Sequence, residues 1–288
     1  MSLTYSIDPL DSIDSFSRCA VHLTALFGDR KLAAGSGVIA QVAGGRCLIT
    51  ARHVFSGRDP ETGQPLRNDG SIPNRIEVEG CNTKFVENLY EGSNDPNSDE
   101  PRFAVDPRGP QIDVAMLSVN PGQLFIALDR SFLIPHQNEQ LTLFVSQTCY
   151  IIGFPEDITH RPRPGVVLPI WKTGHIASEP NLDWHGQPKL LIDATTRNGM
   201  SGAMVVTRNE RRQHRFIGIY TGRCKRPKDE TDECAQADIA ATLPQVKAFV
   251  KSYVDELLDD RFTAELGWVF KSSVVEELRR VRERTPIR

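Results

Sequence analysis

Short apolar runs, separated by glycine, proline, asparagine and aspartate, dominate the first 240 residues of this 288-residue chain. Runs of this length, bounded by turn residues, are typical of β-strands. They cover residues 18–26, 35–42, 47–51, 114–119, 141–145, 149–153, 173–177, 190–192, 203–207 and 215–220. The pattern therefore predicts an all-β protein over most of the chain.

The end of the chain follows a helical pattern instead. Apolar residues between Val246 and Leu258 recur on one helical face, and Pro244 suits the first turn of a helix. A second, Arg-rich segment over residues 274–284 follows a capping box from Ser273 to Glu276. Charged segments of this kind are usually solvated, so we expect a solvated helix, with a partner or nucleic-acid contact as the alternative.

Two stretches between the apolar runs predict long surface loops. Residues 56–74 and residues 91–111 have no clear apolar period, and the second stretch is acidic and rich in proline and asparagine. Loops of this length are usually functional or disordered.

Composition and charge indicate a globular protein without an obvious acidic or basic partner. The formal net charge is −3, which gives no global attraction to nucleic acid or anionic membranes. No stretch is apolar enough to span a bilayer, and residues 1–11 lack the pattern of a secretory signal. We therefore expect a cytoplasmic protein that contacts no membrane, and we expect nucleic acid not to be its partner.

The six cysteines are expected to be reduced. Cys19, Cys47 and Cys149 lie in apolar strand patterns, where a thiol packs as a small hydrophobe. Cys224 and Cys234 flank a charged loop and form the one candidate pair. The histidines show no paired metal-ligand spacing, so we expect neither a metal nor a cofactor.

A serine between glycines, in the run Gly199-Met200-Ser201-Gly202, is the strongest candidate for chemistry. A tight turn there would expose the hydroxyl, and the N–H groups of Gly199 and Ser201 could point at one developing oxyanion. Alone the pattern is weak, because glycine and serine are common in ordinary turns.

Two further segments supply the partners that such a serine needs. The first places His53 at the end of the apolar run 47–51, and the second places Asp113 at the start of the run 114–119. A carboxylate at a buried strand start is costly without a partner, and His53 can be that partner. The resulting order of histidine, aspartate and serine is that of chymotrypsin among the known triads.

Four segments together resemble the trypsin-like serine peptidases of chymotrypsin fold. They are residues 48–53, 113–117, 199–202 and 216–222. The likeness extends over roughly residues 18–260 and is greatest for the cytoplasmic or bacterial single-domain members. It implies two six-stranded antiparallel β-barrels with the active site between them, and C-terminal helices.

On this resemblance we divide the chain into four regions. Residues 1–134 would hold the first barrel with His53 and Asp113, and residues 135–243 the second barrel with Ser201, the oxyanion hole and the P1 pocket. The barrels would be joined near residues 135–138. A helix over residues 244–261 would pack on the second barrel, and residues 262–288 would form a partly helical extension.

The resemblance implies a serine endopeptidase. Ser201 would attack the peptide carbonyl, His53 would move the proton, and Asp113 would hold the imidazole. The alternatives are a catalytically silent binding module on the same scaffold and a serine esterase. Met200 stands where many secreted members carry the acid used in zymogen activation, so we expect narrow specificity or a regulatory protein partner to restrain the enzyme.

Substrate preference stays open. By ungapped matching to the family from Ser201, Thr195 would lie at the base of the P1 pocket with Thr196 beside it. Thr221 would line the substrate strand, Gly222 would also bind substrate, and Arg223 would lie on the pocket wall. Arg223 on the pocket wall would favour an acidic or small polar P1 residue. If its side chain points to solvent instead, the pocket is small and uncharged.

Overall fold

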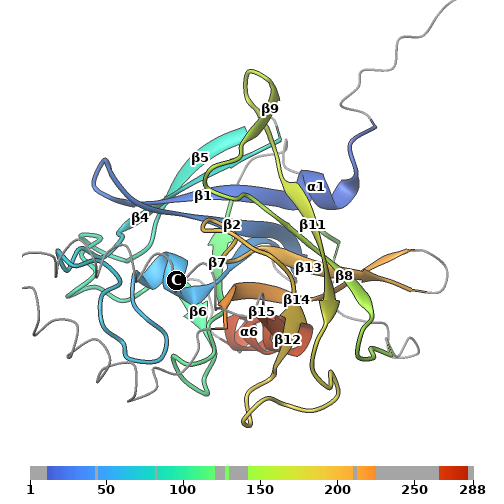
Figure 1. Cartoon of the computed structure of the whole chain (residues 1–288). Helices are drawn as coiled ribbons and strands as arrows, with labels where there is room; N and C mark the ends of the chain where they lie inside the picture. Colours follow the sequence, from blue (N-terminus) through green and yellow to red (C-terminus); the bar gives the residue numbers. More distant parts are fainter. Residues whose placement is uncertain are drawn as a thin grey trace, which may run out of the picture.

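A computed structural model describes residues 12–42, 45–81, 83–120, 127–129, 142–209, 213–224 and 266–284. Within them, most strands form two antiparallel units (Figure 1). The first unit is a seven-stranded sheet in the order β5-β4-β1-β2-β3-β7-β6. Its strands are β1 Ala20–Phe27, β2 Arg30–Val42, β3 Gly45–Thr50, β4 Arg75–Gly80, β5 Thr83–Asn88, β6 Phe103–Val105 and β7 Ala115–Val119.

The second unit is a closed barrel in the order β11-β12-β15-β14-β13-β8. Its strands are β8 Thr148–Gly153, β11 Ile170–Ile176, β12 Lys189–Asp193, β13 Met204–Arg208, β14 His214–Arg223 and β15 Leu266–Lys271. A separate hairpin pairs β9 His160–Arg163 with β10 Val166–Leu168. The helices are α1 Ser15–Cys19, α2 Arg52–Ser56 and α6 Ser272–Arg284.

The all-β class predicted from the apolar runs and the two-unit plan implied by the resemblance are confirmed. Every predicted run is a strand except residues 141–145, where the described residues 142–145 form no strand. The first unit departs from the expected six strands, because β4 and β5 form an additional hairpin at one edge and the short β6 covers the other. Strand β6 lies inside the stretch 91–111 that was expected to be a loop, whereas residues 57–74 hold no named strand.

The sixth strand of the barrel comes from residues that the sequence analysis assigned to an extension beyond residue 262. Strand β15 pairs with β12 on one side and with β14 on the other. Without it, both of those strands would present open edges, which barrels avoid by closure. The apolar run of β15 is short and adjoins a charged helix, so the local sequence does not indicate a barrel strand. Its place in the barrel comes from pairing with β12 and β14, which are distant in sequence.

Helix α6 is confirmed as a helix, but the expectation that it is solvated is wrong. Its residues Val274, Val275 and Leu278 are fully or almost fully buried. They belong to a hydrophobic cluster that also contains Ile49 and Met116 from the sheet, together with barrel residues. The helix therefore packs where the two units meet, and in Figure 1 it lies between β6 and β12.

Each unit also has a hydrophobic cluster of its own. The cluster of the sheet includes Leu23, Ile76 and Leu117, and that of the barrel includes Ile151 and Val205. The molecule thus has one core inside each unit and a third core between them. Burial of this shared core fixes the units relative to each other.

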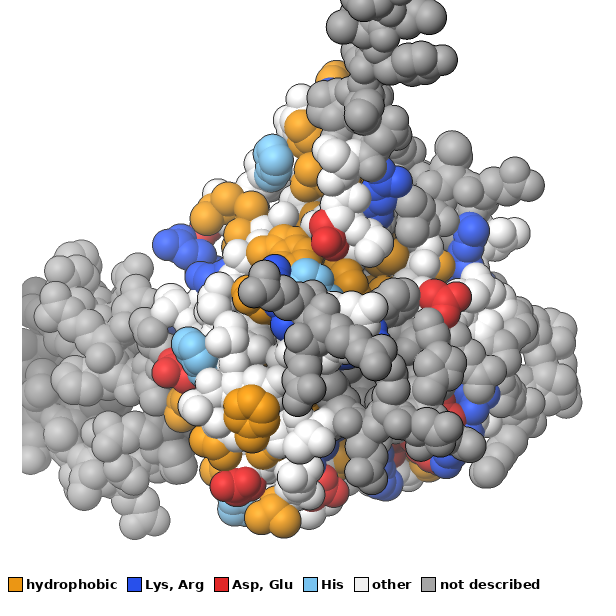
Figure 2. Space-filling view, turned by 90° about the vertical axis from the view of Figure 1, so that its right-hand side faces the viewer, with side chains coloured by type: hydrophobic (Ala, Val, Ile, Leu, Met, Phe, Trp, Pro, Cys, Tyr) orange, Lys and Arg blue, Asp and Glu red, His pale blue; other side chains and the backbone are white. Residues whose placement is uncertain are grey.

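Helix α1 adds a second link between the units. Trp171 of the barrel donates its indole N–H to Ser17 Oγ at 2.8 Å. The rings of Phe16 and His214 meet edge to face at 5.4 Å, and Trp171 contacts the same histidine. Figure 2 shows hydrophobic side chains gathered around a histidine on this side of the molecule.

Two sequence predictions fall on residues outside the described part of the chain. They are the helix over residues 244–261 and the connection near residues 135–138. Among the helices that the structure describes, none has the length and apolar character needed to cross a membrane.

Candidate active site

Strand register brings His53 and Asp113 together. Strands β3 and β7 are antiparallel, and their pairing aligns Thr50 with Ala115. His53 follows the end of β3, in the first turn of α2, and Asp113 precedes the start of β7. The two side chains therefore leave neighbouring strands at the same edge of the sheet.

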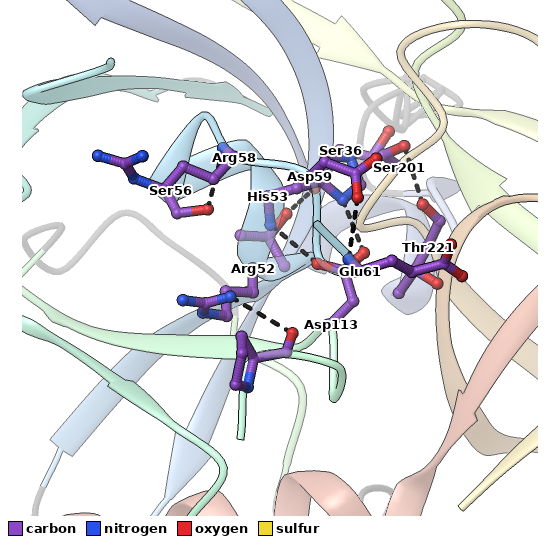
Figure 3. Close-up of polar contacts among 12 residues, drawn as sticks. Ser36, Arg52, His53, Ser56, Arg58, Asp59, Glu61, Asp113, Ser201 and Thr221 are labelled. Carbon is purple, nitrogen blue, oxygen red and sulfur yellow. Dashed lines mark hydrogen bonds and ion pairs between the residues drawn. The ribbon is translucent and has the colours of Figure 1, made fainter. Parts of the chain in front are cut away.

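Two hydrogen bonds join His53 and Asp113. The Asp113 Oδ2 atom lies 2.7 Å from His53 Nδ1, and Asp113 Oδ1 accepts the backbone N–H of His53 at 2.9 Å (Figure 3). Asp113 is only 4% exposed. A buried carboxylate that accepts an imidazole N–H fixes the orientation of the ring and leaves Nε2 as the nitrogen able to take a proton.

Arg52 binds the backbone of the segment that carries the buried carboxylate. Its backbone N–H donates to the carbonyl oxygen of Asp113 at 3.2 Å, and its guanidinium donates to Pro110 O at 3.3 Å. Burial lowers the pKa of Arg52, while the charge of Asp113 acts in the opposite direction and raises it. Nothing in the local sequence around Arg52 indicates this contribution.

Ser201 lies in the turn between β12 and β13 that the glycines predict. Gly199 and Gly202 both have φ of +87°, a region that L-residues rarely adopt. A Cβ on Gly202 would overlap the carbonyl oxygen of Ser36 and the hydroxyl of Thr50. The turn therefore requires glycine at this position because it is pressed against the sheet.

The turn leaves two backbone donors open. The N–H of Met200 donates to Arg197 O at 3.2 Å, and that of Gly202 donates to Tyr220 O at 2.7 Å. The N–H groups of Gly199 and Ser201, by contrast, donate to no acceptor in the part of the chain that the structure describes. The Ser201 hydroxyl donates to the carbonyl oxygen of Thr221 at 3.2 Å.

Ser36, on β2 of the sheet, holds the turn of the barrel. Its backbone N–H donates to Ser201 O at 2.8 Å, and its hydroxyl donates to Gly199 O at 2.7 Å. The same hydroxyl accepts the backbone N–H of Phe154 at 2.8 Å. Ser36 is completely buried. Sequence reasoning missed it, although a serine between two glycines in an apolar strand is the signal that could have found it.

A cavity of about 320 Å³ joins the two sides of the site. His53, Gly199 and Ser201 all line it. The structure thus brings the histidine–aspartate pair and the serine turn to one cavity, each carried by a different unit.

The five residues expected around the P1 pocket differ in their exposure to solvent. Thr195 and Arg223 are exposed, whereas Thr196 and Thr221 are buried and Gly222 is half-buried. The Thr196 hydroxyl lies 2.5 Å from the hydroxyl of Tyr220. Burial raises the pKa of Tyr220 to about 12. None of the five expected residues lines the cavity beside His53.

Among the described residues, Cys19, Cys47, Cys81 and Cys149 are free thiols. Cys19, Cys47 and Cys149 are buried, and burial raises the pKa of Cys47 to about 11. Cys234 lies outside the described residues, so the pairing of Cys224 with Cys234 stays untested. Among the described residues, no group of three or more His, Cys, Asp or Glu side chains could hold a metal ion.

Comparison with known proteins identifies the family. The model of the trypsin-like peptidase domain matches residues 35–219, which is more than half of the chain, and the chain belongs to this family. The resemblance found in the sequence is therefore confirmed. No curated protein sequence matches the chain.

Solved structures of serine proteases are similar to the chain in fold. A thermostable serine protease, AL20, from an extremophilic microorganism has 11% identity and a TM-score of 0.50, with 95% of this chain and 100% of that chain covered. The serine endoprotease from Yersinia pestis has 17% identity and a TM-score of 0.48 over 92% of this chain. The match spans 64% of the length of that endoprotease. At these identities the likeness concerns the fold alone.

Proposed function

We propose that this protein is a serine endopeptidase that hydrolyses peptide bonds through an acyl-enzyme, with His53, Asp113 and Ser201 as its catalytic triad. The observation that carries the proposal is the 2.7 Å contact between His53 and the buried Asp113 at a cavity that also contains Ser201. Membership of a peptidase family supports the same reaction class.

The proposed reaction begins with the Ser201 hydroxyl. Its single hydrogen now points to Thr221 O and must turn to His53 Nε2, which takes the proton as Ser201 Oγ bonds to the peptide carbonyl carbon. Asp113 stabilises the imidazolium that forms. The open N–H groups of Gly199 and Ser201 are suited to the oxyanion. In a serine protease of a different fold, removal of one side-chain donor to the oxyanion costs roughly 2.7–4 kcal/mol.

Collapse of this intermediate breaks the peptide bond. His53 gives its proton to the leaving amine, and the acyl group stays on Ser201 Oγ. Water then attacks the ester with His53 again as base, which releases the acid and restores the serine hydroxyl. The contacts of Ser36 keep Gly199 and Ser201 in place throughout.

Labelling with a fluorophosphonate probe tests the proposal. The wild type should label, whereas Ser201→Ala and His53→Ala should not, and Ser98→Ala, at an exposed loop serine, should label like the wild type. Absence of labelling in a folded wild type would favour the silent binding module. Turnover of ester substrates without any cleavage of peptides would favour the esterase.

A cytoplasmic location and a restraining partner belong to the same proposal. Free, buried thiols are consistent with a reducing compartment. Met200 is uncharged, so it cannot pair with a new N-terminus, and it is completely buried in an apolar cluster. Incubation of the purified protein with cell extract should give cleavage of few proteins. Broad cleavage would contradict the expected restraint.

A further inference from the structure

The cavity beside His53 has an apolar wall that the proposed chemistry does not use. Its apolar lining residues include Leu32, Ala34, Val54, Leu66 and Pro73. Its volume of about 320 Å³ is at the lower end of the range for small-ligand sites. The space is therefore sufficient for one large side chain and its backbone.

Leu66 is the conspicuous residue of this wall. It lies in the loop of residues 57–74 and is 50% exposed, although a leucine gains from burial. The loop is tied to the site on both sides. The Leu66 N–H donates to Gly57 O at 2.8 Å, and the Arg67 guanidinium donates to Leu32 O at 2.9 Å. The exposed leucine is thus held at the cavity by hydrogen bonds of its own loop.

Polar groups close the side of the cavity nearest to the barrel. Glu156 and Asn198 line it there, and the N–H of Glu156 donates to Asn198 O at 2.8 Å. The Glu156 carboxylate lies 3.7 Å from the ammonium group of Lys31, with both side chains about half exposed. The opposite charges of Glu156 and Lys31 compensate each other, and the guanidinium of Arg67, which also lines the cavity, lies 3.4 Å from the carboxylate of Asp69. The cavity therefore selects by shape and apolar contact more than by charge.

The position of the cavity indicates which part of a substrate would enter it. The Ser201 hydroxyl touches Thr221 on β14, the strand expected to bind the acyl side of a peptide. No residue of β14 lines the cavity, which contains His53, the group that gives a proton to the leaving amine. The cavity therefore lies on the leaving-group side of Ser201.

We propose that this cavity binds a large apolar side chain of the residue directly after the scissile bond, and that Leu66 sets this preference. The inference rests on the proposed peptidase function and specifies its substrates. Such peptides carry leucine or a similar residue on the amine side of the cleaved bond.

Acyl transfer to added amines tests this inference apart from acyl-side binding. A panel of N-acetyl amino-acid esters forms the acyl-enzyme, and amino-acid amides then compete with water for it. The amine nitrogen bonds to the acyl carbon while the bond to Ser201 Oγ breaks. The amine proton passes through His53 to the serine oxygen, so no further reactant is needed.

Leucinamide should capture the wild-type acyl-enzyme about tenfold better than glycinamide, since an apolar pocket gives discrimination of this order. Leu66→Ser should reduce this ratio to about threefold or less. Ala34→Leu, which takes up space inside the cavity, should reduce it too. Leu182→Ser changes a leucine that is 66% exposed and outside the cavity, and it should keep the wild-type ratio.

The outcomes separate the two proposals. Acyl-enzyme formation with equal capture of both amides would overturn the inference and leave the peptidase proposal standing. An unchanged ratio in both Leu66→Ser and Ala34→Leu would overturn it as well. Failure of every ester to acylate a folded wild type would contradict the proposed function itself, and the inference with it.

Discussion

The two halves of the candidate site are positioned by different means. In the sheet, His53 and Asp113 follow from the register of two adjacent strands, and their contact needs nothing from the barrel. In the barrel, the turn of Ser201 depends on glycines at positive φ and on Ser36, which belongs to the sheet. The histidine–aspartate pair is thus a local product of one unit, whereas the geometry of the nucleophile turn is a property of the interface.

This contrast has a consequence for stability. The sheet and the barrel each have their own hydrophobic cluster, and the shared cluster, helix α1 and the contacts of Ser36 hold the two units, and so Ser201 and His53, in place relative to each other. Changes inside the shared region should therefore disturb catalysis even when each unit keeps its strands.

The largest effect is expected within the pair of the sheet. Asp113→Asn should lower kcat by about 10⁴-fold, because an asparagine no longer favours the imidazole tautomer that accepts the serine proton. Asp106→Asn is the matched control, since Asp106 is also a buried carboxylate of the sheet but binds Arg108 at 2.7 Å. Steady-state kinetics on a peptide substrate measure both. A loss below tenfold in Asp113→Asn would refute the assigned role.

The next effect concerns the shared core. Leu278→Ala removes a completely buried side chain of α6 and should lower the free energy of unfolding by about 2–5 kcal/mol. Leu182→Ala, at an exposed position, should change it by less than about 0.5 kcal/mol. Urea unfolding followed by tryptophan fluorescence gives both values. Equal stability of the two variants would show that α6 does not join the units energetically.

A smaller effect is expected at Ser36, the link between the halves. Ser36→Ala removes the bond to Gly199 O and leaves the buried Phe154 N–H without its acceptor, at a cost of about 1–3 kcal/mol. If about 1.4 kcal/mol of this cost raises the activation free energy of the reaction at Ser201, fluorophosphonate labelling should slow by about tenfold. The proton NMR signal of His53 Nδ1–H should stay in place. A shift of that signal would mean that the pair also depends on the link.

The smallest effect is on the pH dependence of stability in the sheet. Burial lowers the pKa of His22 from 6.5, despite the opposing charge of Glu79. Because the folded state favours neutral His22, this contribution to stability is complete above pH 6.5 and is lost as pH falls through that value toward the lower folded pKa. Urea unfolding at several pH values should show a weaker loss for His22→Gln than for the wild type.

The residue of the barrel that corresponds to His22 in this respect is His214. Burial lowers the pKa of His214 from 6.5 as well. His214→Gln should reduce the acid sensitivity in the same direction. Because the two histidines lie in different units, their effects should add in the double variant. A double variant that is as acid-sensitive as the wild type would contradict both assignments.

The sequence by itself determined most strands of the chain and the motifs that hold His53, Asp113 and Ser201. These features are local: apolar runs between turn residues, a serine between glycines, and an aspartate at a strand start. The likeness to trypsin-like peptidases rested on the same short segments and is confirmed. The catalytic roles of the three residues stay a proposal.

Only the tertiary structure decided the features that join distant segments. The place of β15 in the barrel depends on β12 and β14, and the buried face of α6 depends on the meeting of two units. Ser36 acquires a role only because β2 lies against the turn of Ser201. Such contacts carry no local period in the sequence, since their free energy comes from pairing and burial between residues far apart along the chain.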